Sequence, residues 1–483
     1  MAETKEIKSP PVSCPPSQLQ YSPSLTRSPL LHSENEDTPH PKNKTPRMPF
    51  TPPRFNLTPL ASPMRKAFKL TKLDPQDAWL PITESRNGNK YYAAFHTLCS
   101  GIGIQALVIP VAFTILGWTW GIISLTIAFI WQLYTLWLLV HLHESREEGV
   151  RYNRYLELCF ATFGEKWGKL LALFPILYLS AGTCTTLIII GGSTARTFYE
   201  ILPNLNSIAG VSLIGAVTAV GYCTSIWVIS VGQGTLPGVS YNPVRGENNV
   251  EKTLGVLNAF GIIAFAFRGH NLILEIQATM PSSDKHPSHV PMWKGVKIAY
   301  TLIAACLFPV AIAGYWAYGQ LIPANGGMLT ALYQFHSHDM SRFVLALTSF
   351  SVVVNCLCSF QIYSMPIFDD MESKYTKKMN KPCPWWLRTS IRIFSGFVSF
   401  FVGVATPFLA SLAGLIGGVA LPVTLAYPCF MWLKVKSPKK YSVMWCLNWF
   451  LGTFGIGLSG LLIGASIYVI IETGVKVSFF NPK

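Results

Sequence analysis

The chain has little charge for its length. Only 13% of its 483 residues are Asp, Glu, Lys or Arg, whereas half are apolar. Soluble domains carry about 25% charged residues, so this deficit excludes an ordinary soluble enzyme and predicts a protein that spans a membrane. The net charge of +15 does not indicate nucleic-acid binding. The Lys and Arg residues lie in the first 75 residues and in short loops between apolar segments, as on the cytoplasmic side of membrane proteins.

Several chemical patterns are also missing. The eleven cysteines show no CxxC spacing, and most lie inside apolar segments, where cysteine behaves as a small buried hydrophobic residue. The sequence contains no nucleophile–base arrangement, no phosphate-binding loop and no cluster of metal ligands. We therefore expect no enzymatic activity, no cofactor and no metal. No cleavable apolar leader opens the chain, so we expect the first internal span to direct insertion.

Residues 1–75 are rich in Pro, Ser and Thr and poor in apolar clusters, which predicts a disordered cytoplasmic head. Eight Ser-Pro or Thr-Pro pairs recur along it, from Ser9-Pro10 to Ser62-Pro63. They are typical either of a regulatory tail phosphorylated by proline-directed kinases or of an inert low-complexity leader. A basic patch that can contact anionic lipid consists of Arg65, Lys66, Lys69 and Lys72.

Residues 76–483 are predicted to form one transmembrane domain, in which apolar segments alternate with charged loops. Ten segments are long enough to cross a bilayer, which takes about 20 residues. They are two within residues 91–141, joined at Gly117, then residues 170–195, 208–230, 254–280, 298–318 and 343–367, two within 393–433, and 445–471. The sequence therefore predicts an all-α polytopic membrane protein with about ten spans.

The positions of Lys and Arg test this count. If the head is cytoplasmic, ten alternating crossings place three basic loops outside, at residues 285–297, 374–392 and 434–440. Lys and Arg prefer the cytoplasmic side, so this topology conflicts with the rule three times. One more crossing between residues 195 and 207 would return all three loops inside. The alternative is that the fourth apolar segment, residues 208–230, does not cross.

Two spans combine helix-breaking glycines with polar residues. The first contains Ser100-Gly101-Ile102-Gly103, and the second contains Phe267-Arg268-Gly269-His270. Ionisable groups inside a bilayer cost about 2.5–3.5 kcal/mol each on insertion scales, so they persist where a cavity or partner receives them. Many secondary transporters build their binding sites from two broken helices in inverted repeats. Matching helices of inverted repeats lie five spans apart rather than four, which again indicates a missing span.

We predict that the two breaks form one substrate site. Backbone amides near Gly101 and Gly103, at the positive end of a half-helix, suit a carboxylate, and carbonyls freed around Phe265 suit an ammonium group. The alternative is that the glycines only permit close helix packing. The predicted substrate-binding residues are Ser100, Gly101, Ile102, Gly103, Gln105, Phe265, Phe267, Arg268 and Asn271.

The second break also supplies the candidates for proton coupling. Arg268, Asn271 and Glu275 are spaced i, i+3, i+7, so on one helix face they would line a central cavity. The alternative is an internal pair between Arg268 and Glu275. Either His270 or Glu275 would carry the proton, although His270 could also be a structural hydrogen-bonding residue. Candidate path-lining residues, which could equally form interhelical hydrogen bonds, are Tyr178, Thr183, Asn355, Ser359 and Tyr363.

Five strings in the sequence carry a family resemblance: WLPITESR at residues 79–86, RYNRY at 151–155, GHNLILEIQ at 269–277, VPMWKG at 290–295 and SFQIYSMP at 359–366. They resemble the plant amino acid/auxin permease family, and within it the lysine/histidine-transporter-like branch. The resemblance implies the architecture of the amino acid–polyamine–organocation superfamily, with five-plus-five inverted repeats, broken helices 1 and 6 and an eleventh helix. It also implies proton-coupled amino acid uptake at the plasma membrane.

The chain departs from this family pattern between residues 195–199 and 202–206, where the family's fourth helix is expected. Such a gap is typical of a splice variant or an imperfect gene model. Two functional hypotheses follow. The first is a proton/amino acid symporter with a cytoplasmic N-terminus, embedded in membrane lipid. The second is a non-transporting regulatory or sensing isoform, impaired by the loss of one transmembrane helix.

Overall fold

The computed structural model describes residues 86–145, 150–195, 208–244, 246–283, 285–324, 326–336, 339–405 and 409–473. The predicted head, its Ser-Pro and Thr-Pro pairs and residues 196–207 lie outside this part of the chain. The elements, in chain order, are α3 (Lys90–Gly101), α4 (Gln105–Leu142), β1 (Glu144–Ser145), β2 (Val150–Arg151), α5 (Tyr155–Phe163), α6 (Glu165–Gly168), the π-helix η2 (Lys169–Leu173), α7 (Phe174–Ala195), α8 (Ile208–Gln233), α9 (Asn249–Ala266), α10 (His270–Ala278), α11 (His289–Tyr318), the 3-10 helix η3 (Gly319–Leu321), α12 (Gly327–His336), α13 (Arg342–Met379), α14 (Trp385–Ala405), α15 (Leu409–Leu421), the π-helix η4 (Pro422–Ala426), α16 (Tyr427–Val435) and α17 (Val443–Thr473).

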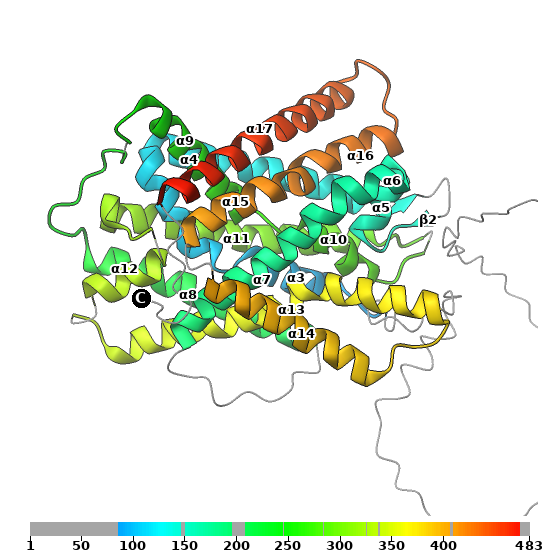
Figure 1. Cartoon of the computed structure of the whole chain (residues 1–483), viewed down its shortest axis with the longest axis horizontal. Helices are drawn as coiled ribbons and strands as arrows, with labels where there is room; N and C mark the ends of the chain where they lie inside the picture. Colours follow the sequence, from blue (N-terminus) through cyan, green and yellow to red (C-terminus); the bar gives the residue numbers. More distant parts are fainter. Residues whose placement is uncertain are drawn as a thin grey trace, which may run out of the picture.

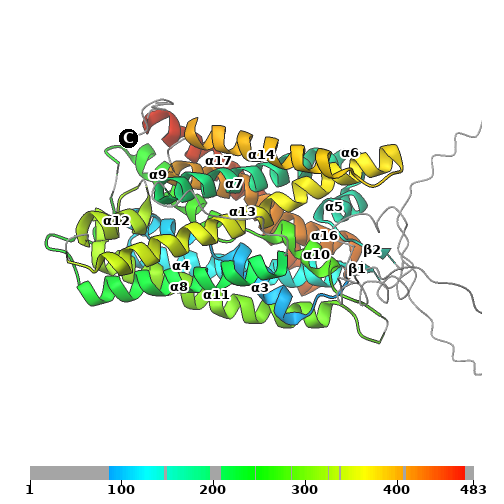
Figure 2. The ribbon, with the colours of Figure 1, turned by 90° about the horizontal axis from the view of Figure 1, so that it is seen from below.

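The long helices lie side by side in one bundle (Figures 1 and 2). Its outer surface is apolar: Ile393 and Phe397 of α14 and Phe450 and Leu461 of α17 are each more than half exposed, between 58% and 68%. An exposed apolar surface of this extent suits lipid rather than water. The protein is therefore a helical membrane protein, and in the described residues the only strands are the two-residue β1 and β2.

Eight of the described helices are long and apolar enough to cross a membrane, whereas the sequence predicted about ten spans. One reason is α4, which counts once but combines the second half of the first span with the whole of the second. Its backbone turns at Gly117, where φ is 69° and ψ is −175°, values that favour glycine. Gly103, just before α4, lies beside the second break, and Thr135, near the other end of α4, hydrogen-bonds His270. The second reason is α14, whose Arg388 and Arg392 lower its hydropathy.

The loops rich in Lys and Arg lie together at one end of the bundle, which we call the basic end. Arg151 donates to the carbonyl of Met280 at the start of the α10–α11 loop, and Arg154 donates to the carbonyl of Asp369 in α13. α16, which leads into the third basic loop, packs against α5 at the same end (Figure 1). The topology of ten alternating crossings is therefore wrong, because it would divide these loops between both ends.

Simple alternation fails because α7 and α8 run in the same direction, although they are consecutive. α7 follows α5 and α6 and so starts at the basic end. α8 starts beside α3, where Ser212 Oγ lies 2.7 Å from His96 Nδ1. Beyond its last residue, Leu236 N–H donates to the carbonyl of Ala317 near the far end of α11. The alternative that residues 208–230 do not cross is thus contradicted, because α8 runs the length of the bundle.

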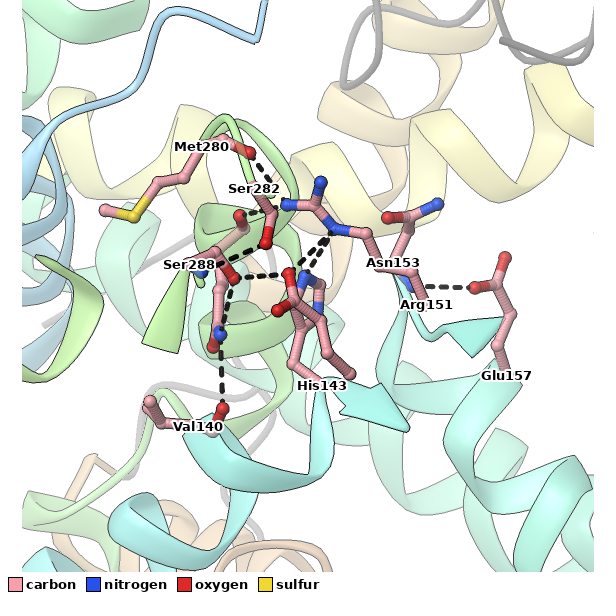
Figure 3. Close-up of polar contacts among 10 residues, drawn as sticks. Val140, His143, Arg151, Asn153, Glu157, Met280, Ser282 and Ser288 are labelled. Atoms are coloured by element: carbon pink, nitrogen blue, oxygen red, sulfur yellow. Dashed lines mark hydrogen bonds and ion pairs between the residues drawn. The ribbon is translucent and has the colours of Figure 1, made fainter. Parts of the chain in front are cut away.

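A buried polar cluster closes the basic end around Arg151 (Figure 3). The Arg151 guanidinium donates from Nη2 to the carbonyls of Gln277 and Met280, at 3.0 and 2.8 Å, and from Nε to His143 Nε2 at 3.0 Å. The Glu144 carboxylate lies 3.6 Å from Arg151 Nε. Burial lowers the pKa of Arg151 to about 10. Because a cation stabilises the C-terminal carbonyls of a helix, Arg151 fixes the end of α10.

His143 is expected to make this cluster sensitive to pH. Its ring is fully buried, and burial together with the Arg151 cation lowers its pKa well below 6.5. A folded-state pKa below the unfolded value gives stability that is present above pH 6.5 and is lost as the pH falls. Thermal unfolding of the purified protein should therefore show a lower melting temperature below pH 6.5, and His143→Gln, which keeps an acceptor for Arg151, should weaken this dependence. His286→Gln, at an exposed position, is the control. Equal pH dependence in all three proteins would contradict the assignment.

Candidate functional site

The first helix break lies between α3 and α4, as the glycines predicted. α3 ends at Gly101, Ile102 is extended with φ −112° and ψ 124°, and α4 starts at Gln105. Among the described residues, no backbone hydrogen bond has the amide of Gly103 or Ile104 as its donor. The break therefore leaves two amides at the positive end of α4.

The second break lies between α9 and α10, also as predicted. α9 ends at Ala266, and α10 starts at His270 after Gly269, which has φ 116° and ψ −2°. This left-handed conformation favours glycine strongly. The carbonyls of Phe265, Ala266 and Phe267 accept no backbone hydrogen bond from the described residues. The second break thus leaves acceptors where the first leaves donors.

The two breaks face each other. A Cβ on Gly269 would lie 3.4 Å from Ser100 Oγ, which is ordinary contact distance. Tyr363 of α13 joins the two breaks, because its hydroxyl donates to the Ser100 carbonyl at 2.7 Å and accepts from Arg268 Nε at 3.1 Å. Two broken helices and α13 therefore meet at one point inside the bundle.

Arg268 occupies this meeting point. Its side chain is 1% exposed, and its guanidinium carbon lies 4.4 Å from the centre of the Phe265 ring and 5.1 Å from that of Tyr363. In the described part of the chain, neither Nη1 nor Nη2 has a hydrogen-bond partner, and no carboxylate lies within 4 Å of the guanidinium. The internal pair between Arg268 and Glu275 is therefore contradicted.

The predicted stripe of Arg268, Asn271 and Glu275 is also wrong. Arg268 precedes Gly269, so the helical register does not extend from it to α10. Asn271 Nδ2 lies 3.3 Å from Ser180 Oγ of α7. Asn271 and Glu275 instead line a separate pocket among α5, α7, α10 and α13, together with other residues such as Arg154, Tyr155, Pro366 and Asp370.

The two candidates for proton coupling lie in different surroundings. His270 is fully buried, and its Nε2 lies 2.9 Å from Thr135 Oγ1 of α4. Glu275 lines the pocket beside Arg154 and Asp370. Neither side chain lies at the meeting point of the breaks, so a coupling role for either would act at a distance from Arg268.

Three of the predicted path-lining residues border the first break from α13. Asn355, Ser359 and Tyr363 follow one another at intervals of four and are fully buried. Asn355 Nδ2 donates to the carbonyl of Gly215 at 2.9 Å, and Ser359 Oγ donates to that of Cys99 at 3.0 Å. They therefore connect α13 to both α8 and α3.

Other predicted residues lie elsewhere. Phe267 packs against Phe129 of α4, with ring centres 6.1 Å apart. Tyr178 stacks on Phe174 within α7, at 5.8 Å. Thr183 of α7 is fully buried, and its hydroxyl has no partner among the described residues.

Sequence reasoning missed Tyr222. Its hydroxyl donates to the carbonyl of Gly103 at 2.6 Å, and the side chain is 1% exposed. It thereby holds the first break from α8. No local pattern marked it, because a tyrosine in a charge-free span is indistinguishable from the apolar residues around it.

A membrane bundle in which two broken helices meet around free amides, carbonyls and a buried cation has the organisation of a secondary transporter. The family model for transmembrane amino acid transporter proteins matches residues 86–201 and 197–472. The chain belongs to this family, which is one of transporters and not of enzymes. The resemblance drawn from the five sequence strings is confirmed.

Curated relatives agree with this assignment. Lysine histidine transporter-like 8 of Arabidopsis thaliana is 53% identical over 509 residues, covering 96% of this chain and 98% of the relative. Lysine histidine transporter-like 7 of the same plant is 43% identical over 438 residues, covering 84% and 90%. Among solved structures, a substrate-bound, outward-open Na⁺-coupled sialic acid symporter matches with a TM-score of 0.49 at 13% identity, covering 79% of this chain and 89% of that one.

The comparisons also bear on residues 195–207. The two family matches overlap at residues 197–201, so the family model matches the chain in two segments that meet there. The alignment with lysine histidine transporter-like 8 has 509 positions, more than the 483 residues of this chain. That relative therefore contains residues with no counterpart here.

Proposed function

We propose that the chain is a proton-coupled amino acid symporter of the plasma membrane and that its substrate binds between the two helix breaks. The observation that carries this proposal is the meeting of the breaks. The substrate carboxylate would accept from the amides of Gly103 and Ile104, at the positive end of α4. Its ammonium group would donate to the carbonyls of Phe265 and Ala266, at the negative end of α9.

Glu275 is the proposed proton carrier, in preference to His270. Glu275 lines a pocket among α5, α7, α10 and α13, so a proton can reach it when that end of the bundle opens. His270 is enclosed, with Thr135 as its partner, and is better explained as a residue that ties α10 to α4. Ionisable groups inside a bilayer that remain without a structural role are candidates for proton relay.

The basic end is the proposed cytoplasmic side, because basic loops prefer the cytoplasm. α3 starts at this end, where Gly88 N–H donates to the carbonyl of Thr279. The head that precedes α3 would then be cytoplasmic, where kinases reach its Ser-Pro and Thr-Pro pairs.

Uptake of labelled amino acids into transport-deficient cells tests the symporter. Uptake should rise as the external medium is acidified, because the proton gradient drives it. Glu275→Gln should retain amino acid binding and lose most of this acid stimulation. Thr253→Ala, at an exposed helix position in α9, is the control. Uptake no higher than in untransformed cells would contradict transport, and unchanged acid stimulation in Glu275→Gln would contradict the role of Glu275.

The second candidate function is a non-transporting regulatory or sensing isoform. The shared direction of α7 and α8 favours this hypothesis. The helices of a symporter must move in every transport cycle and keep their topology, whereas those of a sensing isoform need not. Such an isoform would still bind amino acids between the breaks. Binding by the purified protein together with background uptake would favour the isoform over the symporter.

A further inference from the structure

Arg268 is a buried cation with no carboxylate within 4 Å of its guanidinium among the described residues. Its Nε donates to the Tyr363 hydroxyl, whereas Nη1 and Nη2 have no acceptor within the described residues. The rings of Phe265 and Tyr363 flank the guanidinium and hold it in place. Removing a charge from water costs several kcal/mol unless a partner compensates it. The two free Nη groups therefore indicate an anion that arrives from outside the chain.

Two amide oxygens accompany the guanidinium. Gln105 Oε1 and Asn355 Oδ1 are buried and have no partner in the part of the chain that the structure describes. Their orientation is fixed, because Gln105 Nε2 donates to the carbonyl of Gly101 at 2.6 Å and Asn355 Nδ2 to that of Gly215 at 2.9 Å. The oxygens are thus the free ends of both amides, and each can accept a further hydrogen bond.

These groups surround Gly103. A Cβ built on Gly103 would lie 2.9 Å from Gln105 Oε1, 3.2 Å from Arg268 Nη2 and 3.7 Å from Asn355 Oδ1. The missing side chain of Gly103 is what allows the three polar groups to approach the first break. Unpartnered donors and acceptors therefore converge at the place where the proposed function puts the substrate.

We infer that Arg268 selects amino acids whose side chain carries a carboxylate. This inference rests on the proposed binding of amino acids between the breaks. The amides of Gly103 and Ile104 receive the α-carboxylate, and the fork of Nη1 and Nη2 matches the two oxygens of a second carboxylate. The same guanidinium repels lysine and arginine side chains. The oxygen of Gln105 or Asn355 accepts from the third N–H of the substrate ammonium group, whose other two donate to the carbonyls of Phe265 and Ala266.

Competition binding to the full-length protein in detergent tests this selectivity, with L-glutamate, L-aspartate, L-leucine and L-lysine as probes. Glutamate or aspartate should bind at least tenfold more tightly than lysine. Arg268→Gln, which keeps most of the side-chain volume, should weaken dicarboxylate binding by about tenfold to a hundredfold, the range for a charge-assisted hydrogen bond. Leucine binding should change by less than about threefold. Arg268→Lys should retain part of the preference, because it keeps the charge and loses the fork.

The control is Arg388→Gln. Arg388 pairs with Glu372 near the basic end at 3.0 Å, so this substitution should leave the selectivity unchanged. Lysine binding as tight as glutamate binding would overturn the inference. An equal loss for all four amino acids in Arg268→Gln would also overturn it and would assign Arg268 to the α-carboxylate. Leucine binding without glutamate or aspartate binding would refute the selectivity alone, whereas binding of none of the four would refute the proposed function itself.

Discussion

Gly417→Ala is expected to destabilise the bundle by about 3 kcal/mol or more and to leave little folded protein. A Cβ on Gly417 of α15 would lie 1.9 Å from the carbonyl oxygen of Gly261 and 2.8 Å from the amide nitrogen of Phe265, both in α9. Overpacking usually costs about 1–3 kcal/mol where side chains can move. Backbone atoms cannot rotate away, so the cost here should reach or exceed the top of that range.

The effect should extend to the substrate site. Gly261 meets α15 in the same way, since its Cβ would lie 2.7 Å from the carbonyl oxygen of Gly414. Small residues at a crossing let two membrane helices approach closely, and α9 carries Phe265 into the second break. A larger residue at 417 therefore pushes the broken helix away from its support.

Size-exclusion profiles and thermal unfolding in detergent measure this effect. Gly457→Ala and Gly464→Ala in α17 are matched controls, because a Cβ at either position meets nothing within 4 Å. An alanine in an exposed helix interior favours the helix by up to about 1 kcal/mol relative to glycine, so both controls should fold. A melting temperature of Gly417→Ala close to those of the controls would show that the α9–α15 contact is looser than described.

The helix breaks could be predicted from the sequence because their causes are local. Two glycines in a charge-free span, and Gly269 beside Arg268 in another, weaken helices wherever they stand. The turn of α4 at Gly117 was predictable for the same reason. The breaks therefore appeared in the structure within a residue or two of their expected positions.

The directions of the side chains could not be predicted. Spacing arguments assume a continuous helix, so they placed Arg268 on one face with Asn271 and Glu275. The break at Gly269 turns Arg268 toward α13 instead, where Tyr363 accepts its hydrogen bond. The role of Tyr222 could not be predicted either, because it depends on the packing of α8 beside α3, which is a feature of the tertiary structure.

The number and direction of the spans could be predicted only in part. Positive charge correctly indicated that simple alternation fails, because the preference of Lys and Arg for one side is a property of the loops alone. Simple alternation failed, because packing against α13 holds both α7 and α8 in the same direction. The second half of the bundle thus keeps its orientation even though the count of spans is even.

Inserting a transmembrane helix between Ala195 and Ile208 is expected to raise the yield of folded protein and the uptake of amino acids. α7 ends far from the basic end and α8 starts near it, with twelve residues between them. A helix of that length would span about 18 Å, whereas the hydrocarbon core is about 30 Å thick. The segment to insert is an apolar helix of about 20 residues, long enough to cross the bilayer.

Uptake should increase, because 1–2 kcal/mol of added stability raises the ratio of folded to unfolded protein by about 5–30-fold. A Gly/Ser linker of equal length, inserted at the same position, is the control and should give no gain, since it cannot cross as a helix. Glycosylation-site mapping should place residues 374–381 on the same side as residues 151–154 in the helix-inserted protein. Equal behaviour of both insertions would mean that the described arrangement of α7 and α8 needs no crossing between them. Opposite sides for those two loops would mean that the bundle cannot bring its two broken helices together.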